Sequence, residues 1–192
     1  MSGNGFHVHG PHDHELEHAA QHEPKGMAGQ LAVITAVLAT VGAMFSYMGG
    51  ATQANAALYK NDAAIKKTEA SNQWNYYQAK SSKQSLAELA LDLSSSEEQR
   101  AKYRDKIARY DKEKNEIKEK AEALENDSTE FNHRSDEQMH QHHRWAQATT
   151  ALQISIALAA IALLTKRRWM KGATLGVGAI GVLLGALAWF HV

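Results

Sequence analysis

The chain has 192 residues, 21 of them basic and 21 acidic, so its balanced charge gives no reason to expect a nucleic-acid partner. It contains no cysteine, which excludes disulfides and thiolate metal sites. The charges avoid three stretches, residues 26–59, 145–165 and 172–192, and are dense between them. This segregation is typical of a membrane protein with one long insert outside the bilayer.

Residues 1–26 form a polar leader without the apolar periodicity of a packed element, so we expect it to be flexible. Six histidines lie in it: His7, His9, His12, His14, His18 and His22. Neutral imidazoles bind Zn, Ni or Cu, and a tract of this kind collects such ions with modest affinity. The alternative interpretation is a soluble leader whose histidines bind no metal.

Residues 27–49 are predicted to form a first transmembrane helix. The run from Met27 to Met48 has 22 residues, enough to cross a hydrocarbon core of about 30 Å. It begins after a polar leader, too late for a cleaved signal peptide, so we interpret it as a retained anchor. The Gly49-Gly50 pair weakens a helix and marks either a kink or a joint.

Residues 50–144 are predicted to form a long antiparallel coiled-coil hairpin outside the membrane, with its turn near residues 94–96. A spacing of three and four residues defines a seam in each arm. In the second arm the seam comprises Tyr103, Ile107, Tyr110, Ile117, Ala121, Leu124 and Phe131, with Lys114 and Ser128 as polar interruptions. In the first arm it is predicted to comprise Leu58, Asn61, Ile65, Thr68, Asn72, Asn75, Ala79, Ser82, Leu86, Leu89 and Leu93. At 1.5 Å per residue the hairpin would extend roughly 60 Å.

Two aromatic residues of the first arm, Trp74 and Tyr77, lie on a second face of the predicted helix, with Tyr76 beside them. They are candidates for a binding platform, although aromatic residues at helical spacing more often pack against their neighbours.

A second group of histidines and carboxylates lies at the end of the hairpin. Asp136, His140 and His143 are spaced i, i+4 and i+7, and His133 shares a helical face with His140. One carboxylate and several imidazoles on one face are suited to a divalent metal. The alternative is a solvated or interfacial face.

Residues 145–165 and 172–191 are predicted to be the second and third transmembrane helices, joined by a basic loop at 166–171. The third contains two GxxxG pairs, Gly172 with Gly176 and Gly181 with Gly185, a pattern that lets another helix approach closely. We therefore expect an interface on this helix. Four positive charges in the loop place it in the cytoplasm, which puts the N-terminus there too and the hairpin on the outer, periplasmic side.

The block Ala70-Ser71-Asn72-Gln73-Trp74-Asn75-Tyr76-Tyr77-Gln78-Ala79-Lys80-Ser81 resembles an uncharacterised bacterial membrane family, domain of unknown function 4337. The resemblance continues through Arg109-Tyr110-Asp111-Lys112-Glu113-Lys114 to the basic loop and covers roughly residues 27–190. It implies an integral membrane protein with a coiled-coil insert, and it carries over no catalytic residue.

The predicted fold is therefore all-α: three transmembrane helices with a long antiparallel coiled-coil hairpin between the first and second. We find no catalytic motif, and no Asp, Glu, Lys or Arg lies within a predicted span. The predicted function is a non-enzymatic structural or interaction protein of the membrane, which forms a homo-oligomer or joins other membrane-protein subunits. The alternative is a metal-handling accessory protein that uses the two histidine groups, with a divalent transition metal as its only cofactor.

Overall fold

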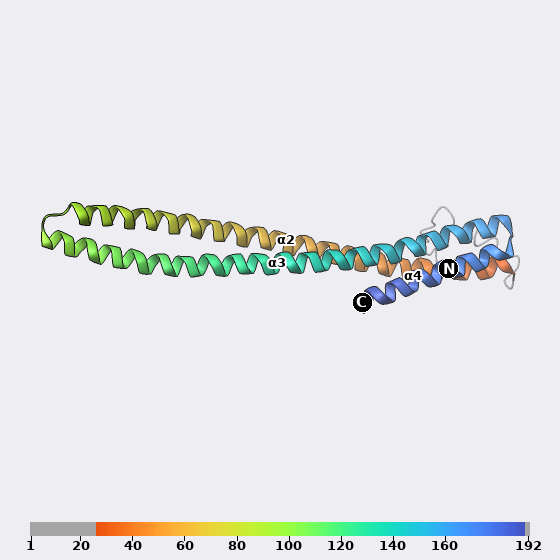
Figure 1. The fold of residues 1–192 in the computed structure, drawn as a ribbon. Coiled ribbons are helices and arrows are strands. Elements are labelled where there is room, and N and C mark those ends of the chain that lie inside the picture. The colour runs from red at the N-terminus through yellow and green to blue at the C-terminus, as the bar shows by residue number, and fades with distance from the viewer. Residues whose placement is uncertain (1–25, 191–192) are drawn as a thin grey trace, which may run out of the picture. The chain divides into compact units, whose positions relative to one another are not determined.

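The structure, a computed structural model, describes residues 26–190, and these fold into three helices (Figure 1). Helix α2 covers Met27–Leu93, α3 covers Glu97–Thr165 and α4 covers Arg168–Trp189. The described residues contain no strand, so the all-α prediction is confirmed. Helix α2 continues through Gly49 and Gly50, which sit in ordinary helical backbone rather than at a break.

The described chain divides into two compact units, and α2 and α3 each contribute to both. Unit 1 contains residues 26–53 and 139–190, and unit 2 contains Ala54–Gln138.

In unit 2 the two helices run antiparallel and share hydrogen bonds along their length (Figure 1). Ser128 Oγ donates to the Ala63 carbonyl at 2.8 Å, and Ser135 Oγ donates to the Ala56 carbonyl at 2.8 Å. From the first bond to the second, the chain advances by seven residues on α3 and goes back by seven residues on α2. This is the register of two helices that pair through a heptad repeat.

The α3 side of this contact matches the sequence prediction, since every seam position named for the second arm is buried or half-buried. The α2 side does not. Its contact positions are Ala56, Tyr59, Ala63, Lys66, Ala70, Gln73, Tyr77, Lys80, Gln84, Ala87 and Leu91. The seam predicted for the first arm is therefore wrong by two residues, which turns it by about 200° to the opposite face of the helix.

Small residues on α2 explain this contact. Ala63 and Ala70 are buried on α2, and Ala121 is fully buried on α3. Large side chains enter the contact from both helices, and Phe131 of α3 stacks on Tyr59 of α2 with ring centroids 6.3 Å apart. The alanines on α2 lie between such side chains and allow close packing of the two helices.

The turn between α2 and α3 comprises only Ser94, Ser95 and Ser96. The Arg100 guanidinium donates to the carbonyls of Leu91 and Ser94, at 3.3 and 3.2 Å. The Leu91 carbonyl belongs to the last turn of α2 and the Ser94 carbonyl follows directly after it, where carbonyls lack N–H donors and a cation is favourable. Arg100 therefore holds the end of one helix from the start of the next.

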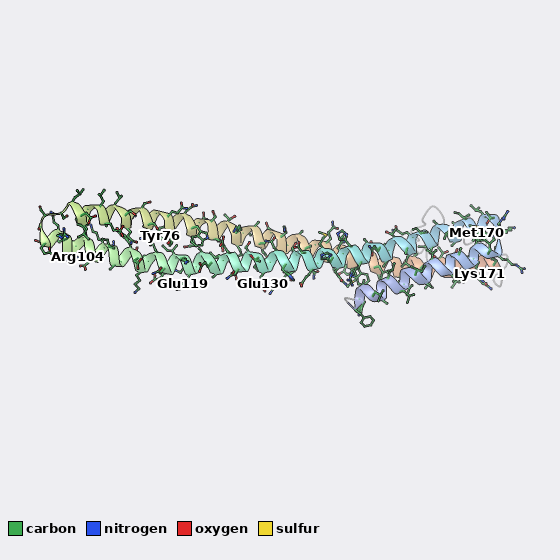
Figure 2. The ribbon with its side chains drawn as sticks, in the orientation of Figure 1. Tyr76, Arg104, Glu119, Glu130, Met170 and Lys171 are labelled. Carbon is green, nitrogen blue, oxygen red and sulfur yellow. The ribbon has the colours of Figure 1, made fainter. Side chains whose placement is uncertain are left out.

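Each of the three helices contains an apolar stretch long enough to cross a membrane. In unit 1, α4 packs against both other helices. The Ser155 hydroxyl of α3 donates to the Thr174 carbonyl of α4 at 2.7 Å, and both side chains are fully buried. Met170, near the start of α4, packs with Leu31 and Ala162, and the neighbouring Lys171 ammonium donates to the Gln30 side chain (Figure 2).

Candidate functional site

The outer face of α2 in unit 2 carries most of the apolar surface of that unit. The exposed large apolar residues there are Leu58, Ile65, Tyr76, Leu86, Leu89 and Leu93, with exposed fractions between 48 and 78%. Within residues 97–138, α3 contributes none. Unit 2 therefore has one face with regularly placed apolar side chains and an opposite face that is polar.

We call the eleven positions that the sequence predicted as the first-arm seam the outer stripe. All eleven are exposed. The heptad spacing that the sequence shows is therefore real, but it belongs to a face that α3 does not cover. An exposed helix face with a/d spacing is a surface suited to another helix.

The polar surface of α3 carries several ion pairs within the helix, such as Arg134 with Glu130 and Lys102 with Glu98. Glu119 and Glu130 are among the charged side chains labelled on it in Figure 2. Exposed pairs of this kind contribute little to stability, and they keep the face hydrated.

Across the helix pair, Lys80 Nζ lies 2.5 Å from Glu113 Oε2. The hydrogen bond and charge of Lys80 hold the pKa of Glu113 below its ordinary value of 4.5, and Glu113 in turn raises the pKa of Lys80. Lys67 Nζ lies 2.7 Å from Glu125 Oε1 and lowers the pKa of that carboxyl, with a smaller contribution from Trp74. These two ion pairs join α2 to α3 at the partly exposed edges of the contact. They favour the register in which each lysine lies beside its glutamate.

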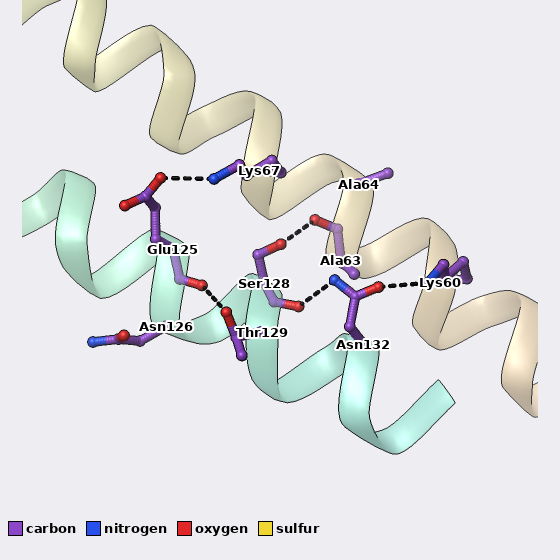
Figure 3. A pocket seen from close by; sticks show the side chains of 9 residues that line it. All are labelled: Lys60, Ala63, Ala64, Lys67, Glu125, Asn126, Ser128, Thr129 and Asn132. Atoms are coloured by element: carbon purple, nitrogen blue, oxygen red, sulfur yellow. Dashed lines mark hydrogen bonds and ion pairs between the residues drawn. The ribbon is translucent and has the colours of Figure 1, made fainter. Parts of the chain in front are cut away.

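An open groove of about 610 Å³ lies between the helices of unit 2, beside the Ser128–Ala63 hydrogen bond (Figure 3). Lys60 Nζ donates to Asn132 Oδ1 at 2.8 Å at one end, and the Lys67–Glu125 pair closes the other. Apart from Asn126, its polar side chains are hydrogen-bonded to one another or to nearby backbone. The groove is therefore an open, polar edge of the helix contact and lacks the apolar, enclosed lining of a typical ligand pocket.

The aromatic residues predicted as a platform divide between two roles. Tyr77 is half-buried in the seam, its ring 5.7 Å from Trp74 in an edge-on contact, and Lys114 Nζ lies 5.6 Å from its centroid. Tyr76 is 53% exposed and has Lys80 Nζ 5.3 Å from its ring. Trp74 and Tyr77 thus take part in packing, while Tyr76 flanks the outer stripe.

The four glycines predicted as an interface on α4 fall into two pairs with different surroundings. A methyl group on Gly181 would lie 2.7 Å from Leu152 Cδ2 and 3.1 Å from the Leu152 backbone nitrogen, and one on Gly185 would overlap the Phe45 ring. These two glycines are contact points with α3 and α2 of the same chain. Gly172 and Gly176 have open space where a side chain would be.

Sequence reasoning missed a polar cluster in unit 1. His142 Nδ1 lies 2.8 Å from the Gly49 carbonyl oxygen, and Gln141 Nε2 donates to the Ala188 carbonyl near the end of α4. Trp145, which is 2% exposed, packs between Phe45 and Trp189 with centroid distances of 5.3 and 6.4 Å. The signal for this cluster was Gly49, whose lack of a side chain gives His142 and Trp145 access to α2.

The predicted metal sites gain no support. The leader histidines lie outside the described residues. Among residues 26–190, no three histidine, aspartate or glutamate side chains gather as a metal ion would need. His133 Nδ1 instead lies 3.2 Å from Glu137 Oε1 on its own helix. Metal binding at Asp136, His140 and His143 stays a prediction from sequence.

These observations define a class of protein. It is all-α, each of its three helices carries a membrane-length apolar stretch, and the parts of α2 and α3 that lie between the first two apolar stretches pair with each other. Residues 27–191 match the family model described as Domain of unknown function (DUF4337), and the chain belongs to this family. No curated protein and no solved structure matches the chain.

Proposed function

We propose that this protein is a non-enzymatic integral membrane protein that acts through association, using unit 2 as a contact module outside the bilayer. The observation that carries the proposal is the placement of exposed apolar side chains. Unit 1 has them on all three helices, for example Val37 on α2, Ile154 on α3 and Leu183 on α4.

Unit 1 buries polar groups and exposes apolar ones, which is the arrangement expected in lipid. Ser155, Thr174 and Gln141 are buried with hydrogen-bond partners, and Trp189 is exposed at the end of α4. Bilayers favour this arrangement because polar atoms in hydrocarbon must find partners within the protein, and aromatic side chains favour the interface.

The basic loop between α3 and α4 supports an orientation. Lys166, Arg167, Arg168 and Lys171 lie in or beside the connection, and basic residues accumulate on the cytoplasmic side of membranes. We infer a bacterial inner-membrane location, with the N-terminus and this loop in the cytoplasm and the coiled-coil hairpin of residues 50–144 on the periplasmic side. Because each span crosses to the other side, the N-terminus and this loop lie on one side of the membrane and the hairpin lies on the other. One assignment therefore determines the rest.

Association is the activity that unit 2 supports best. Most polar side chains of its groove are hydrogen-bonded within the protein, whereas its outer stripe offers exposed apolar side chains at coiled-coil spacing. The partner is a second copy of the chain or another membrane-protein subunit. The metal-handling alternative has no observation in its favour among the described residues.

Native mass spectrometry of the complex extracted in lipid nanodiscs tests the proposal. We expect either a multiple of the 21.1 kDa chain mass or a co-purifying membrane subunit. A chain that is only monomeric in lipid would contradict association. Alkaline carbonate extraction tests the membrane assignment separately: release of the protein from the membrane fraction would overturn it.

Orientation is tested with single cysteines, because the natural chain contains none. Glu119→Cys in unit 2 should react with a membrane-impermeant maleimide added to cells with a permeabilised outer membrane. Lys166→Cys should react only after the inner membrane is lysed. The reverse pattern would overturn the proposed orientation.

A further inference from the structure

We propose that the outer stripe of α2 is a homotypic interface, on which α2 of a second copy of this chain packs in parallel and in register. The proposal rests on the membrane anchoring in the proposed function, since two hairpins that leave the same membrane face point the same way. It adds the identity of the partner, the face that is used and the register.

The apolar residues of the outer stripe have the spacing of a helix-pairing seam, and the chain's own second arm does not cover them. In heptad terms Leu58, Ile65, Leu86 and Leu93 occupy a positions and Leu89 occupies a d position. All five are exposed, with fractions between 48 and 78%. Residues 97–138 of α3 present no exposed large apolar side chain, so within unit 2 the complementary surface is α2 itself.

The middle of the stripe is polar, and this favours an identical partner. Asn72 occupies an a position and Asn61 and Asn75 occupy d positions, all of them exposed. In a parallel pair in register, each asparagine faces its own copy and the two amides satisfy one another. A shift by one heptad would place Asn72 against Ile65 or Ala79, which leaves its amide unpaired. Asparagine in a seam is the best-known device for fixing register in this way.

The residues that flank the stripe are compatible with this arrangement. In a parallel pair, each residue before an a position faces the residue five places further along in the partner helix. Lys83 then faces Gln78 of the second copy, Glu69 faces Ala64, and Asp62 faces Ala57, so no like charges oppose each other.

The apolar surface of the stripe is exposed and would be covered on pairing. Covering the stripe and the adjoining Tyr76 would remove six large apolar side chains of each chain from water, each of them 48–78% exposed in the single chain. Two chains held in one membrane also meet at a raised effective concentration, which strengthens a modest interface.

Cysteine crosslinking of the full-length protein in its membrane tests the proposal, because the chain has no cysteine of its own. The single variants Ile65→Cys and Leu89→Cys place a thiol toward either end of the stripe. Glu119→Cys, on the exposed face of α3, is the matched control (Figure 2). Mild oxidation, or a short bismaleimide, should give a dimer band about tenfold stronger at both stripe positions than at Glu119.

A mixture of Ile65→Cys and Leu89→Cys chains identifies the direction. Parallel pairing in register gives only 65–65 and 89–89 products. A 65–89 product would overturn it in favour of an antiparallel pair, and crosslinks no stronger than at Glu119 would overturn the interface altogether.

Two further results separate this proposal from the broader one. An oligomer by native mass spectrometry without stripe crosslinks leaves association intact and overturns the stripe as the interface. A monomer in lipid overturns both. The double variant Leu86→Glu/Leu89→Glu should reduce the 65–65 crosslink about tenfold, with the far-UV circular dichroism of the chain unchanged. An unchanged crosslink in a folded double variant would also overturn the proposal.

Discussion

The Ser128 hydroxyl crosses from α3 to donate to the main-chain carbonyl of Ala63 on α2 at 2.8 Å, and Ser135 repeats this contact on Ala56 one heptad away. Serine fits here because its side chain is small enough for close helix approach and still reaches the opposite backbone. Both serines are buried, at 4 and 5% exposed. Polar residues that look like defects in an apolar seam therefore fix its register.

Replacing Ser128 with alanine should lower the free energy of unfolding of unit 2 by about 1 kcal/mol, the usual net contribution of one hydrogen bond. The Ala63 carbonyl keeps its helical partner, so no buried group is left unpaired. Hydrogen exchange of the unit 2 amides measures the change. Thr129→Ala is the control, because the Thr129 hydroxyl bonds only within its own helix, to the Glu125 carbonyl.

Enlarging the small residues of the seam should be more harmful than enlarging those of the outer stripe. Ala70 is fully buried and Ala79 is exposed on the opposite side of α2. We expect Ala70→Leu to destabilise unit 2 by about 1–3 kcal/mol through overpacking. Ala79→Leu should leave its stability within about 0.5 kcal/mol. Equal effects in a urea titration followed by circular dichroism would contradict the assigned seam.

The second arm could be predicted from sequence because its seam carries the large side chains. The spacing of large apolar residues such as Ile107 and Ile117 predicts the contact face correctly. In the first arm the contact face mixes small alanines, such as Ala63 and Ala70, with polar and aromatic residues such as Tyr77. A search for hydrophobic periodicity ranks such a face below a leucine stripe. The stronger pattern, the leucine stripe, therefore predicts the wrong face as the internal seam, because it lies on the face that α3 leaves open.

The interior of unit 1 was predictable only in part. Composition identified the apolar stretches and the glycine-rich α4. It did not indicate that Gly181 and Gly185 contact their own chain, because spacing alone does not distinguish neighbours within a chain from those in another. The His142 contact with Gly49 depends on how three helices meet, which no local pattern encodes.

The two kinds of glycine on α4 should respond differently to substitution. Gly181→Val should destabilise unit 1, because even a methyl group there meets the Leu152 backbone nitrogen at 3.1 Å, and backbone does not move aside easily. Gly176→Val should be tolerated, since nothing lies within 4 Å of the added atom. Thermal unfolding in detergent, followed by tryptophan fluorescence, compares the two variants. A loss of stability at Gly176 alone would contradict this packing.

The Lys80–Glu113 pair makes the stability of unit 2 depend on pH at both extremes. The Glu113 pKa is lowered on folding, so its contribution is complete above the ordinary value of 4.5 and is lost as the pH falls through the folded value. The Lys80 pKa is raised from 10.5, so its contribution is complete below that value and is lost as the pH rises through the folded one. Between these limits the pair is intact.

Glu113→Gln should therefore destabilise unit 2 at pH 7 and flatten the loss of stability on acidification, because the carboxylate whose protonation causes part of that loss is gone. Urea titrations of the full chain at a series of pH values from neutral to acidic measure both effects. Glu119→Gln is the matched control, since Glu119 is exposed and makes none of the ion pairs of the described residues. It should follow the natural chain across the series. If Glu113→Gln retained the acid dependence of the natural chain, the contact with Lys80 would have no part in it. The pH dependence would then come from other carboxylates, of which the Glu125–Lys67 pair is the next to test through Glu125→Gln.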